Sequence, residues 1–410
     1  MTRMTIKRGP RTLLLASIYM MGILGIVASG GSGGGGSDDE NFSCGITVAD
    51  IDPATDSSGD IWLSASVVVD PADVPEHLNR VIRVKSNGLE ASSFLVGTGN
   101  GQNWATSIAA AVDGSGDVYA GGDFSKGILR LNSDGSLDAD FAIGSGFNGR
   151  VTKVAPATDG SATVYVAGNF SEYNGNPVGQ TIRLNANGSV DGSFNPSITS
   201  TSIALATDGS DDIYVGLNRL NSNGSLDTNY PSATCVSSLA AAADLDFGDV
   251  YFYCNSNVSL ERFNSTGTRD LGFSDGFGLV LRDLNDPQFP PSIVPAVDGT
   301  SAIYVGGYLE RYDLNPVNDI IRLNNDGSIE ANFITGSGFD RGRFGNGSIH
   351  SVVRAKDGTT DIYAGGEFDF YNGIITKSVA RLNDDGSLDS GFQIRINTDR
   401  GVCDKQTNLE

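Results

Sequence analysis

Histidine, tryptophan and cysteine are scarce in this chain. Its 410 residues include two histidines, two tryptophans and four cysteines. The histidines, His77 and His350, lie far apart in the sequence, and no His-Glu-x-x-His or Cys-x-x-Cys string occurs. A histidine-ligated metal site or a Ser-His-Asp triad would have to use a single histidine, so we expect no catalytic, metal or cofactor site.

Positive charge is also scarce. The chain has 27 basic and 49 acidic residues, which gives a net charge of −22. Such a field repels nucleic acid and anionic membranes, so we expect neither as a partner. No segment outside the N-terminus shows a helical period, and the 54 glycines favour an all-β protein with many tight turns.

The N-terminus has the pattern of an export signal. A basic stretch is followed by an apolar run from Leu13 to Val27 and by the small residues Ala28-Ser29-Gly30. We predict a signal peptide over 1–30, with an uncleaved anchor as the alternative, and a Gly/Ser-rich tether over 31–43. No cysteine follows the apolar run, so we expect no lipid anchor. The mature chain would be secreted, periplasmic or at the cell surface, without membrane insertion.

One sequence unit recurs along the rest of the chain. Its first part is Asp-Gly followed by a short strand with an aromatic residue, and its second part is an apolar-Arg-Leu-Asn strand, a turn and a closing aromatic residue. The distance from the arginine to the closing aromatic is 11 residues in all seven copies. The three positions are, in order, Trp62, Tyr119, Tyr165, Tyr214, Tyr251, Tyr304 and Tyr363; Arg83, Arg130, Arg183, Arg219, Arg262, Arg322 and Arg381; and Phe94, Phe141, Phe194, Tyr230, Phe273, Phe333 and Phe392.

Each copy is expected to form four strands. In the third repeat these are Val151–Ala155, Val164–Ala167, Thr181–Asn185 and Ser189–Phe194, with Asn187-Gly188 supplying the tight turn between the last two. Four strands per repeat and no helix predict an all-β, seven-bladed β-propeller of four-stranded antiparallel blades, with the ring closed near the termini. We assign 44–410 to this one domain, with repeats at 45–94, 95–141, 142–194, 195–230, 231–273, 274–333 and 334–392.

The sequence resembles the delta-60 repeat family of bacterial β-propeller proteins. The resemblance is carried by Ile321-Arg322-Leu323-Asn324 with Asp326-Gly327-Ser328, and by Tyr363-Ala364-Gly365-Gly366. It implies the propeller fold, but no general activity.

Four cysteines in an exported chain allow three pairings. Cys44 precedes the first repeat and Cys403 follows the last, so ring closure would bring these two together. Cys235 and Cys254 flank the first hairpin of the fifth repeat. We therefore predict the disulfides Cys44–Cys403 and Cys235–Cys254.

An acid lies eight residues after the arginine in six repeats. We interpret these acids as hairpin partners of the arginine, and a ring of cation or sugar sites is the alternative. They are Asp138, Asp191, Asp227, Asp270, Glu330 and Asp389.

The long connections all belong to one face of the predicted disc, which makes that face the candidate binding surface. They are 67–80, 171–180, 274–291, 309–319, 340–348 and 369–377. The candidate partner-binding residues on them are Phe277, Arg282, Phe289, Arg341, Arg343, Phe344, Tyr173 and Tyr371.

We expect a non-enzymatic, monomeric, extracytoplasmic propeller that acts as a binding or scaffold module for a protein or glycan partner. One alternative is a carbohydrate-active hydrolase or lyase on the same scaffold, which paired carboxylates near the central channel would favour. The other alternative is a structural envelope protein.

Overall fold

The computed structural model describes residues 44–69, 76–98, 103–230, 249–254, 259–282, 290–342, 345–398 and 401–403. Every helix or strand assigned in these ranges is a β-strand, as the composition predicted. The expected signal peptide and tether lie outside them. Within the described ranges, no helix has the length and apolar character that a bilayer crossing needs.

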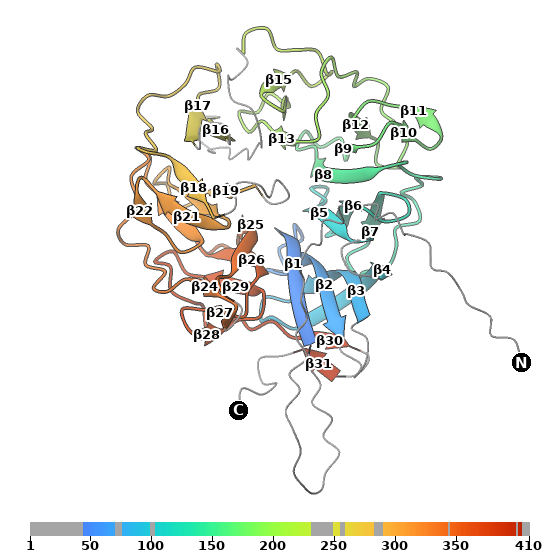
Figure 1. The fold of residues 1–410 in the computed structure, drawn as a ribbon. Helices are drawn as coiled ribbons and strands as arrows, with labels where there is room; N and C mark the ends of the chain where they lie inside the picture. Colours follow the sequence, from blue (N-terminus) through green and yellow to red (C-terminus); the bar gives the residue numbers. More distant parts are fainter. Residues whose placement is uncertain are drawn as a thin grey trace, which may run out of the picture. The chain divides into compact units, whose positions relative to one another are not determined.

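Each sequence repeat forms an antiparallel sheet of its own (Figure 1). The strands of repeats one to four are β1 (Cys44–Pro53), β2 (Ile61–Val69), β3 (Glu76–Val84) and β4 (Glu90–Thr98); β5 (Ala105–Ala110), β6 (Val118–Gly122) and β7 (Ile128–Leu131); β8 (Arg150–Pro156), β9 (Val164–Asn169) and β12 (Thr181–Leu184); and β13 (Ile203–Leu205), β14 (Ile213–Val215) and β15 (Asn218–Leu220). Those of repeats five to seven are β16 (Val250–Cys254) and β17 (Ser259–Phe263); β19 (Ser292–Pro295), β20 (Ile303–Gly306) and β23 (Ile320–Leu323); and β25 (Ser348–Arg354), β26 (Ile362–Glu367) and β29 (Val379–Leu382).

The fourth strand is regular in the first repeat alone, among the described residues. In the other repeats it is reduced to a single bridge, such as Leu184↔Val190. The acid eight residues after the arginine accounts for the difference. In the third repeat the Asp191 carboxylate accepts the backbone N–H of Ser193, which turns the chain away from the sheet. The first repeat has Ala91 at the equivalent position, and there β4 continues to Thr98.

Four predicted connections are more ordered than expected. In the first repeat β2 and β3 pair as far as Val69↔Glu76, so most of 67–80 is strand, with 70–75 outside the described residues. In repeats three, six and seven the connection after the tyrosine strand folds into a small outer hairpin. The outer strands are β10 (Glu172–Tyr173) and β11 (Asn176–Pro177); β18 (Leu279–Leu281), β21 (Leu309–Tyr312) and β22 (Asn315–Pro316); and β24 (Phe339–Asp340), β27 (Phe370–Tyr371) and β28 (Ile374–Ile375).

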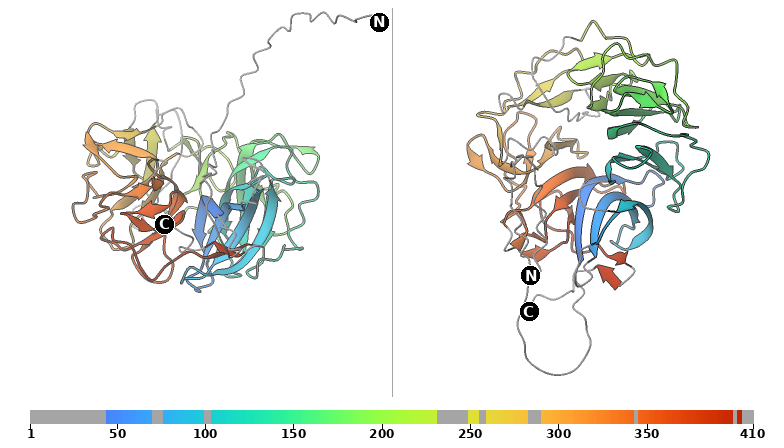
Figure 2. Two further views of the ribbon diagram at one scale, coloured as in Figure 1. Left: turned by 60° about the horizontal axis from the view of Figure 1, so that its bottom comes forward. Right: turned by 45° about the vertical axis from the view of Figure 1, so that its right-hand side comes forward.

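The first sheet packs against both the second and the last. Trp62 and Val81 lie in one apolar cluster with Ile108, while Val48 lies in another with Tyr363. Figure 2 shows the β1 and β26 sheets side by side. The C-terminal strands β30 (Ile396–Thr398) and β31 (Gly401–Cys403) form a further pair. Burial of large apolar side chains contributes about 1.5–3 kcal/mol each, so these clusters stabilise the packing of the first sheet against its two neighbours.

Candidate functional site

The repeated arginine stacks on the repeated aromatic residue. The two residues lie directly opposite each other on adjacent strands, as in Tyr363↔Arg381 and Trp62↔Arg83. The guanidinium carbon lies 5.3 to 5.9 Å from the aromatic ring centre in every repeat. This arrangement is a cation–π contact inside each sheet.

The predicted acid pairs with this arginine in five repeats. Arg183 bonds Asp191 at 2.7 Å and Arg262 bonds Asp270 at 2.5 Å, and the pairs at Asp138, Asp389 and Asp227 are longer, at 3.4, 3.2 and 3.9 Å. Glu330 is the exception among the described residues: its carboxylate accepts the backbone N–H of Asn332, and Arg322 pairs with Asp298.

Further acids from the first turn also reach the arginine in every repeat except the third, where Asp191 is the one acid paired with Arg183 among the described residues. In repeat seven Arg381 lies 2.7 Å from both Asp357 and Asp361, in addition to Asp389. Burial acts to raise the pKa of Asp357, but hydrogen bonds from Thr359 and Arg381 outweigh it and lower that pKa. The arginine therefore ties together the two turns at one end of its sheet.

The arginines also join neighbouring repeats. Arg83 donates to the carbonyl of Ser133, and Arg183 donates to that of Ser222, each at 2.9 Å. Apart from Arg322 Nε, which is buried without a hydrogen-bond partner, these guanidinium groups bond within the protein, which supports the structural interpretation of the arginine–acid pairs. No group of His, Cys, Asp or Glu side chains in the described ranges could hold a metal ion.

The tyrosines of the outer hairpins lie inside the protein. Tyr173 and Tyr371 are buried, and their hydroxyls donate at 2.5 Å to the carbonyls of Gly188 and Gly386 in the same repeats. The prediction that these two tyrosines contact a partner is therefore wrong. Each one anchors its outer hairpin to the turn that follows the arginine strand.

A side-chain clamp fixes the tip of each outer hairpin. The Oδ1 atom of Asn174, Asp313 or Asn372 accepts a backbone N–H from the segment that enters the repeat. The donors are Ser145, Phe277 and Ser337, at 3.1, 3.1 and 3.2 Å. The hairpins are thus held at both base and tip, so their outer residues are presented on a rigid support.

Phe277 is the one predicted contact residue that the described chain leaves largely exposed, at 75%. Arg282 forms an ion pair with Asp319, and Arg341 lies 2.7 Å from Glu367. Burial raises the pKa of Asp319 to about 7, although Arg282 acts to lower it. Phe289, Arg343 and Phe344 lie outside the described residues.

The sequence analysis missed a second exposed apolar side chain beside Phe277. Leu314 follows the clamp residue Asp313 and is 63% exposed. Its signal in the sequence is the Asp-Leu pair at the hairpin tip, where the sister hairpins have Asn-Gly.

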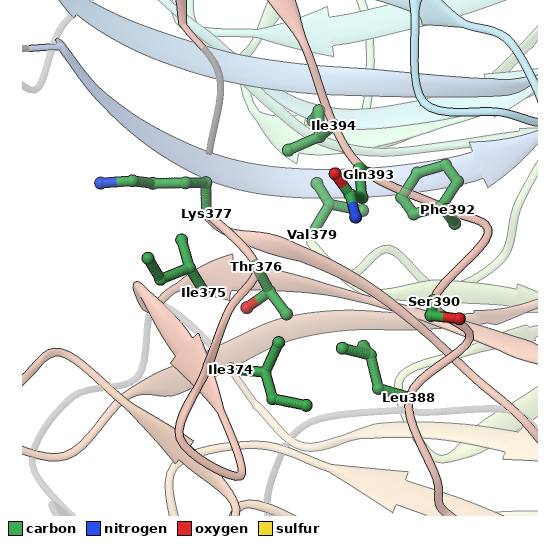
Figure 3. A pocket seen from close by; sticks show the side chains of 10 residues that line it. All are labelled: Ile374, Ile375, Thr376, Lys377, Val379, Leu388, Ser390, Phe392, Gln393 and Ile394. Atoms are coloured by element: carbon green, nitrogen blue, oxygen red, sulfur yellow. The ribbon is translucent and has the colours of Figure 1, made fainter. Parts of the chain in front are cut away.

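A small pocket lies in repeat seven, between the residues after β27 and the segment that closes the repeat (Figure 3). Isoleucines 374 and 375, Leu388 and Phe392 form apolar walls, and Thr376 Oγ1 is buried there without a hydrogen-bond partner. Its volume of about 90 Å³ suits an aliphatic side chain, well below the ~300 Å³ of the smallest usual ligand sites. None of the candidate partner-binding residues lines it, although 374–377 belong to the predicted connection 369–377.

Two carboxylates lie close together on β1. Asp50 accepts the backbone N–H of Ile108 at 3.0 Å, and Asp52 accepts that of Ala110 at 2.7 Å. Burial raises the pKa of Asp52. Both acids therefore hold β5 against β1. A carboxylate that accepts these backbone hydrogen bonds is less available for acid–base chemistry on a sugar.

The predicted disulfides remain predictions. Cys235 lies outside the described residues, as do the side chains of Cys44 and Cys403. Cys254 is fully buried in β16.

Comparisons with known proteins identify the fold type. Four stretches, 112–141, 163–194, 302–333 and 357–392, match a family described as "Domain of unknown function (DUF5122) beta-propeller". They coincide with repeats two, three, six and seven and cover less than half of the chain. Together with the all-strand architecture, these matches make the protein a β-propeller of a repeat type. No curated protein matches the sequence.

Solved structures with some similarity include three from different organisms. Sqt1 from Chaetomium thermophilum is 12% identical, with a TM-score of 0.40 over 78% of this chain and 93% of its own. A functionally unknown protein from Desulfotomaculum acetoxidans is 9% identical, with a TM-score of 0.28 over 87% and 88% of the two chains. YCF48 from Cyanidioschyzon merolae is 10% identical, with a TM-score of 0.32 over 82% and 94%.

Proposed function

We propose that this β-propeller is a non-enzymatic, extracytoplasmic module that binds or scaffolds a protein or glycan partner. The observation that carries the proposal is the set of outer hairpins. Each is anchored by a buried tyrosine and clamped at its tip, and one of them presents Phe277 at 75% exposure. A rigid support with exposed apolar side chains is the arrangement expected of a binding surface.

We further propose that seven blades of the delta-60 type close into one ring. Each of seven clusters of buried apolar side chains combines residues of two neighbouring sheets, and one of them combines the last sheet with the first. This continuous packing supports a closed ring. A second argument comes from the joints between repeats. The turn glycine of repeat six, Gly327, faces the backbone of Ser274, the residue that directly follows the closing aromatic of repeat five. In the same way, Gly88 of repeat one faces the backbone of Gln393, the residue that directly follows the closing aromatic of repeat seven.

The export signal, the tether without a lipid site and the monomeric state are parts of the same proposal. They rest on the basic and apolar N-terminal pattern and on the charge of −22. The hydrolase alternative has weaker support, because Asp50 and Asp52 are engaged by the backbone of β5.

Thermal unfolding of the mature, oxidised protein with a panel of glycans, peptides and divalent cations tests the function. A ligand at a hundredfold excess over its Kd stabilises the native state by about 2.7 kcal/mol. A rise in Tm with one ligand class and no turnover of that ligand supports the binding module. Turnover of a glycan would favour the hydrolase or lyase over the binding module. An ordered multimer whose Tm no ligand changes would favour the structural envelope protein.

A further inference from the structure

The outer hairpin of repeat six differs from its two sisters at two positions. The residue that donates its N–H to the clamp is Ser145 in repeat three and Ser337 in repeat seven, but Phe277 in repeat six. The residue after the clamp is glycine in both sisters and Leu314 in repeat six. Because the hydrogen bond of the clamp is the same, the sisters serve as internal references for what the fold itself requires.

Both differences place a large apolar side chain in solvent at the same tip. Phe277 donates to the Oδ1 atom of Asp313 at 3.1 Å, and Leu314 is the next residue in the chain. Leu314 also has a φ of +64°, a conformation in which its sisters Gly175 and Gly373 are unstrained. A bulky side chain at positive φ strains the backbone, and an apolar side chain that stays in water adds no hydrophobic stabilisation to the fold. Neither substitution therefore serves the stability of the hairpin.

We propose that Phe277 and Leu314 form a docking site for a protein segment that carries apolar side chains flanked by Lys or Arg. This inference rests on the proposed binding function and names its partner chemistry. The two side chains supply the apolar contact, and the acidic character of the chain supplies the attraction for basic flanks.

The surroundings of the tip favour this occupant over two others. A second copy of the chain would bring two net charges of −22 together, and these repel each other. The area that two side chains bury is also far below the ~800 Å² per partner of a stable interface. A glycan needs several free hydrogen-bonding groups, whereas the Oδ1 atom of Asp313 is occupied by the Phe277 N–H. A basic segment of another protein gains from the net charge of −22 and from the exposed carboxylate of Asp313 at the tip, whereas the nearby Glu310 is already paired with Arg311 at 3.4 Å.

The experiment replaces the tip with the residues of its sisters. The double variant Phe277→Ser, Leu314→Gly is compared with the wild type and with Leu137→Ser, which removes an exposed leucine from repeat two. The probe is a fluorescent peptide with a Leu-Phe pair between lysines, and its twin has glutamates in place of the lysines. Binding is measured by fluorescence anisotropy at low and high salt.

We expect the lysine peptide to bind the wild type and Leu137→Ser equally, and the double variant at least about tenfold more weakly. The glutamate twin should not bind, and salt should weaken the lysine peptide. The double variant should keep or raise its Tm, because glycine relieves the strain at position 314, so lost binding would not reflect unfolding.

Equal binding to the double variant, or no binding of the lysine peptide to the wild type, would overturn the proposal. Dimerisation that the double variant abolishes would assign the tip to a second copy instead. If a ligand from the panel above still binds the double variant, the proposed binding function stands, but Phe277 and Leu314 are not its binding site.

Discussion

Replacing Arg381 with methionine should destabilise the protein strongly. The change keeps the apolar stem but removes a buried guanidinium that contacts Asp357 and Asp361 at 2.7 Å and Asp389 at 3.2 Å. It also removes the hydrogen bond to the Tyr363 hydroxyl at 3.1 Å. Breaking a buried pair on one side costs about 3–5 kcal/mol, and three carboxylates would be left facing one another. We expect a loss of about 3 kcal/mol or more in the free energy of unfolding.

The same change should make stability depend on pH in a defined direction. The folded-state pKa of Asp357 is lowered, so its contribution is present above the unfolded value of 3.8 and is lost as the pH falls through the folded value. The deficit of the Arg381→Met variant should therefore be largest at neutral pH and shrink below pH 4. Urea unfolding at pH 7 and pH 3.5 measures it, with Arg269→Met as the control, because Arg269 is about half exposed and pairs with Glu261 at 3.5 Å. A deficit below about 1 kcal/mol for Arg381→Met, or one that does not change with pH, would refute this reasoning.

Three further changes test other parts of the structure. Burial raises the pKa of Asp319 to about 7, so its contribution to stability is fully present below pH 3.8 and is lost as the pH rises towards 7; Asp319→Asn should flatten the stability profile across that window, and an unchanged slope would contradict the assignment. Tyr371→Phe leaves the Gly386 carbonyl without its hydroxyl donor and should cost about 1 kcal/mol in urea unfolding, as Tyr173→Phe should in repeat three; no loss in either variant would argue against the hairpin anchors. Peptide mapping of the oxidised protein should recover the pairs Cys44–Cys403 and Cys235–Cys254, and any other pairing would contradict the predicted ring closure.

The spacing of the repeat was sufficient to predict the core of each sheet. A constant distance of 11 residues from arginine to closing aromatic requires a rigid unit. The structure places the arginine of the unit opposite its tyrosine, as Arg183 and Tyr165 show in repeat three. The acid at Asp191 was also predictable, because an offset of eight residues across a short turn brings the two side chains together. The acids Asp357 and Asp361 were missed. They precede Arg381 by 24 and 20 residues, and their approach depends on both turns lying at the same end of the sheet.

The remaining differences arise where a side chain competes with regular backbone pairing. The fourth strand was expected over Ser189–Phe194, but Asp191 caps the next turn and ends the pairing after one bridge. Tyr173 was assigned to the binding surface because it lies on a long connection, whereas the hairpin places its ring inside. Local pattern cannot reveal that inward direction, because it depends on the Gly188 carbonyl in a later turn of the same repeat.

The most direct test of the closed propeller compares two glycine substitutions. Gly88 and Gly373 both have a positive φ, of 88° and 75°, so alanine strains the backbone at either site. A Cβ at Gly373 would meet open space, whereas one at Gly88 would collide with the backbone of Gln393, which directly follows repeat seven. If repeat seven packs against repeat one, Gly88→Ala should lower the free energy of unfolding by at least about 2 kcal/mol more than Gly373→Ala. Equal losses for the two variants would mean that the joint is absent and would contradict the closed ring.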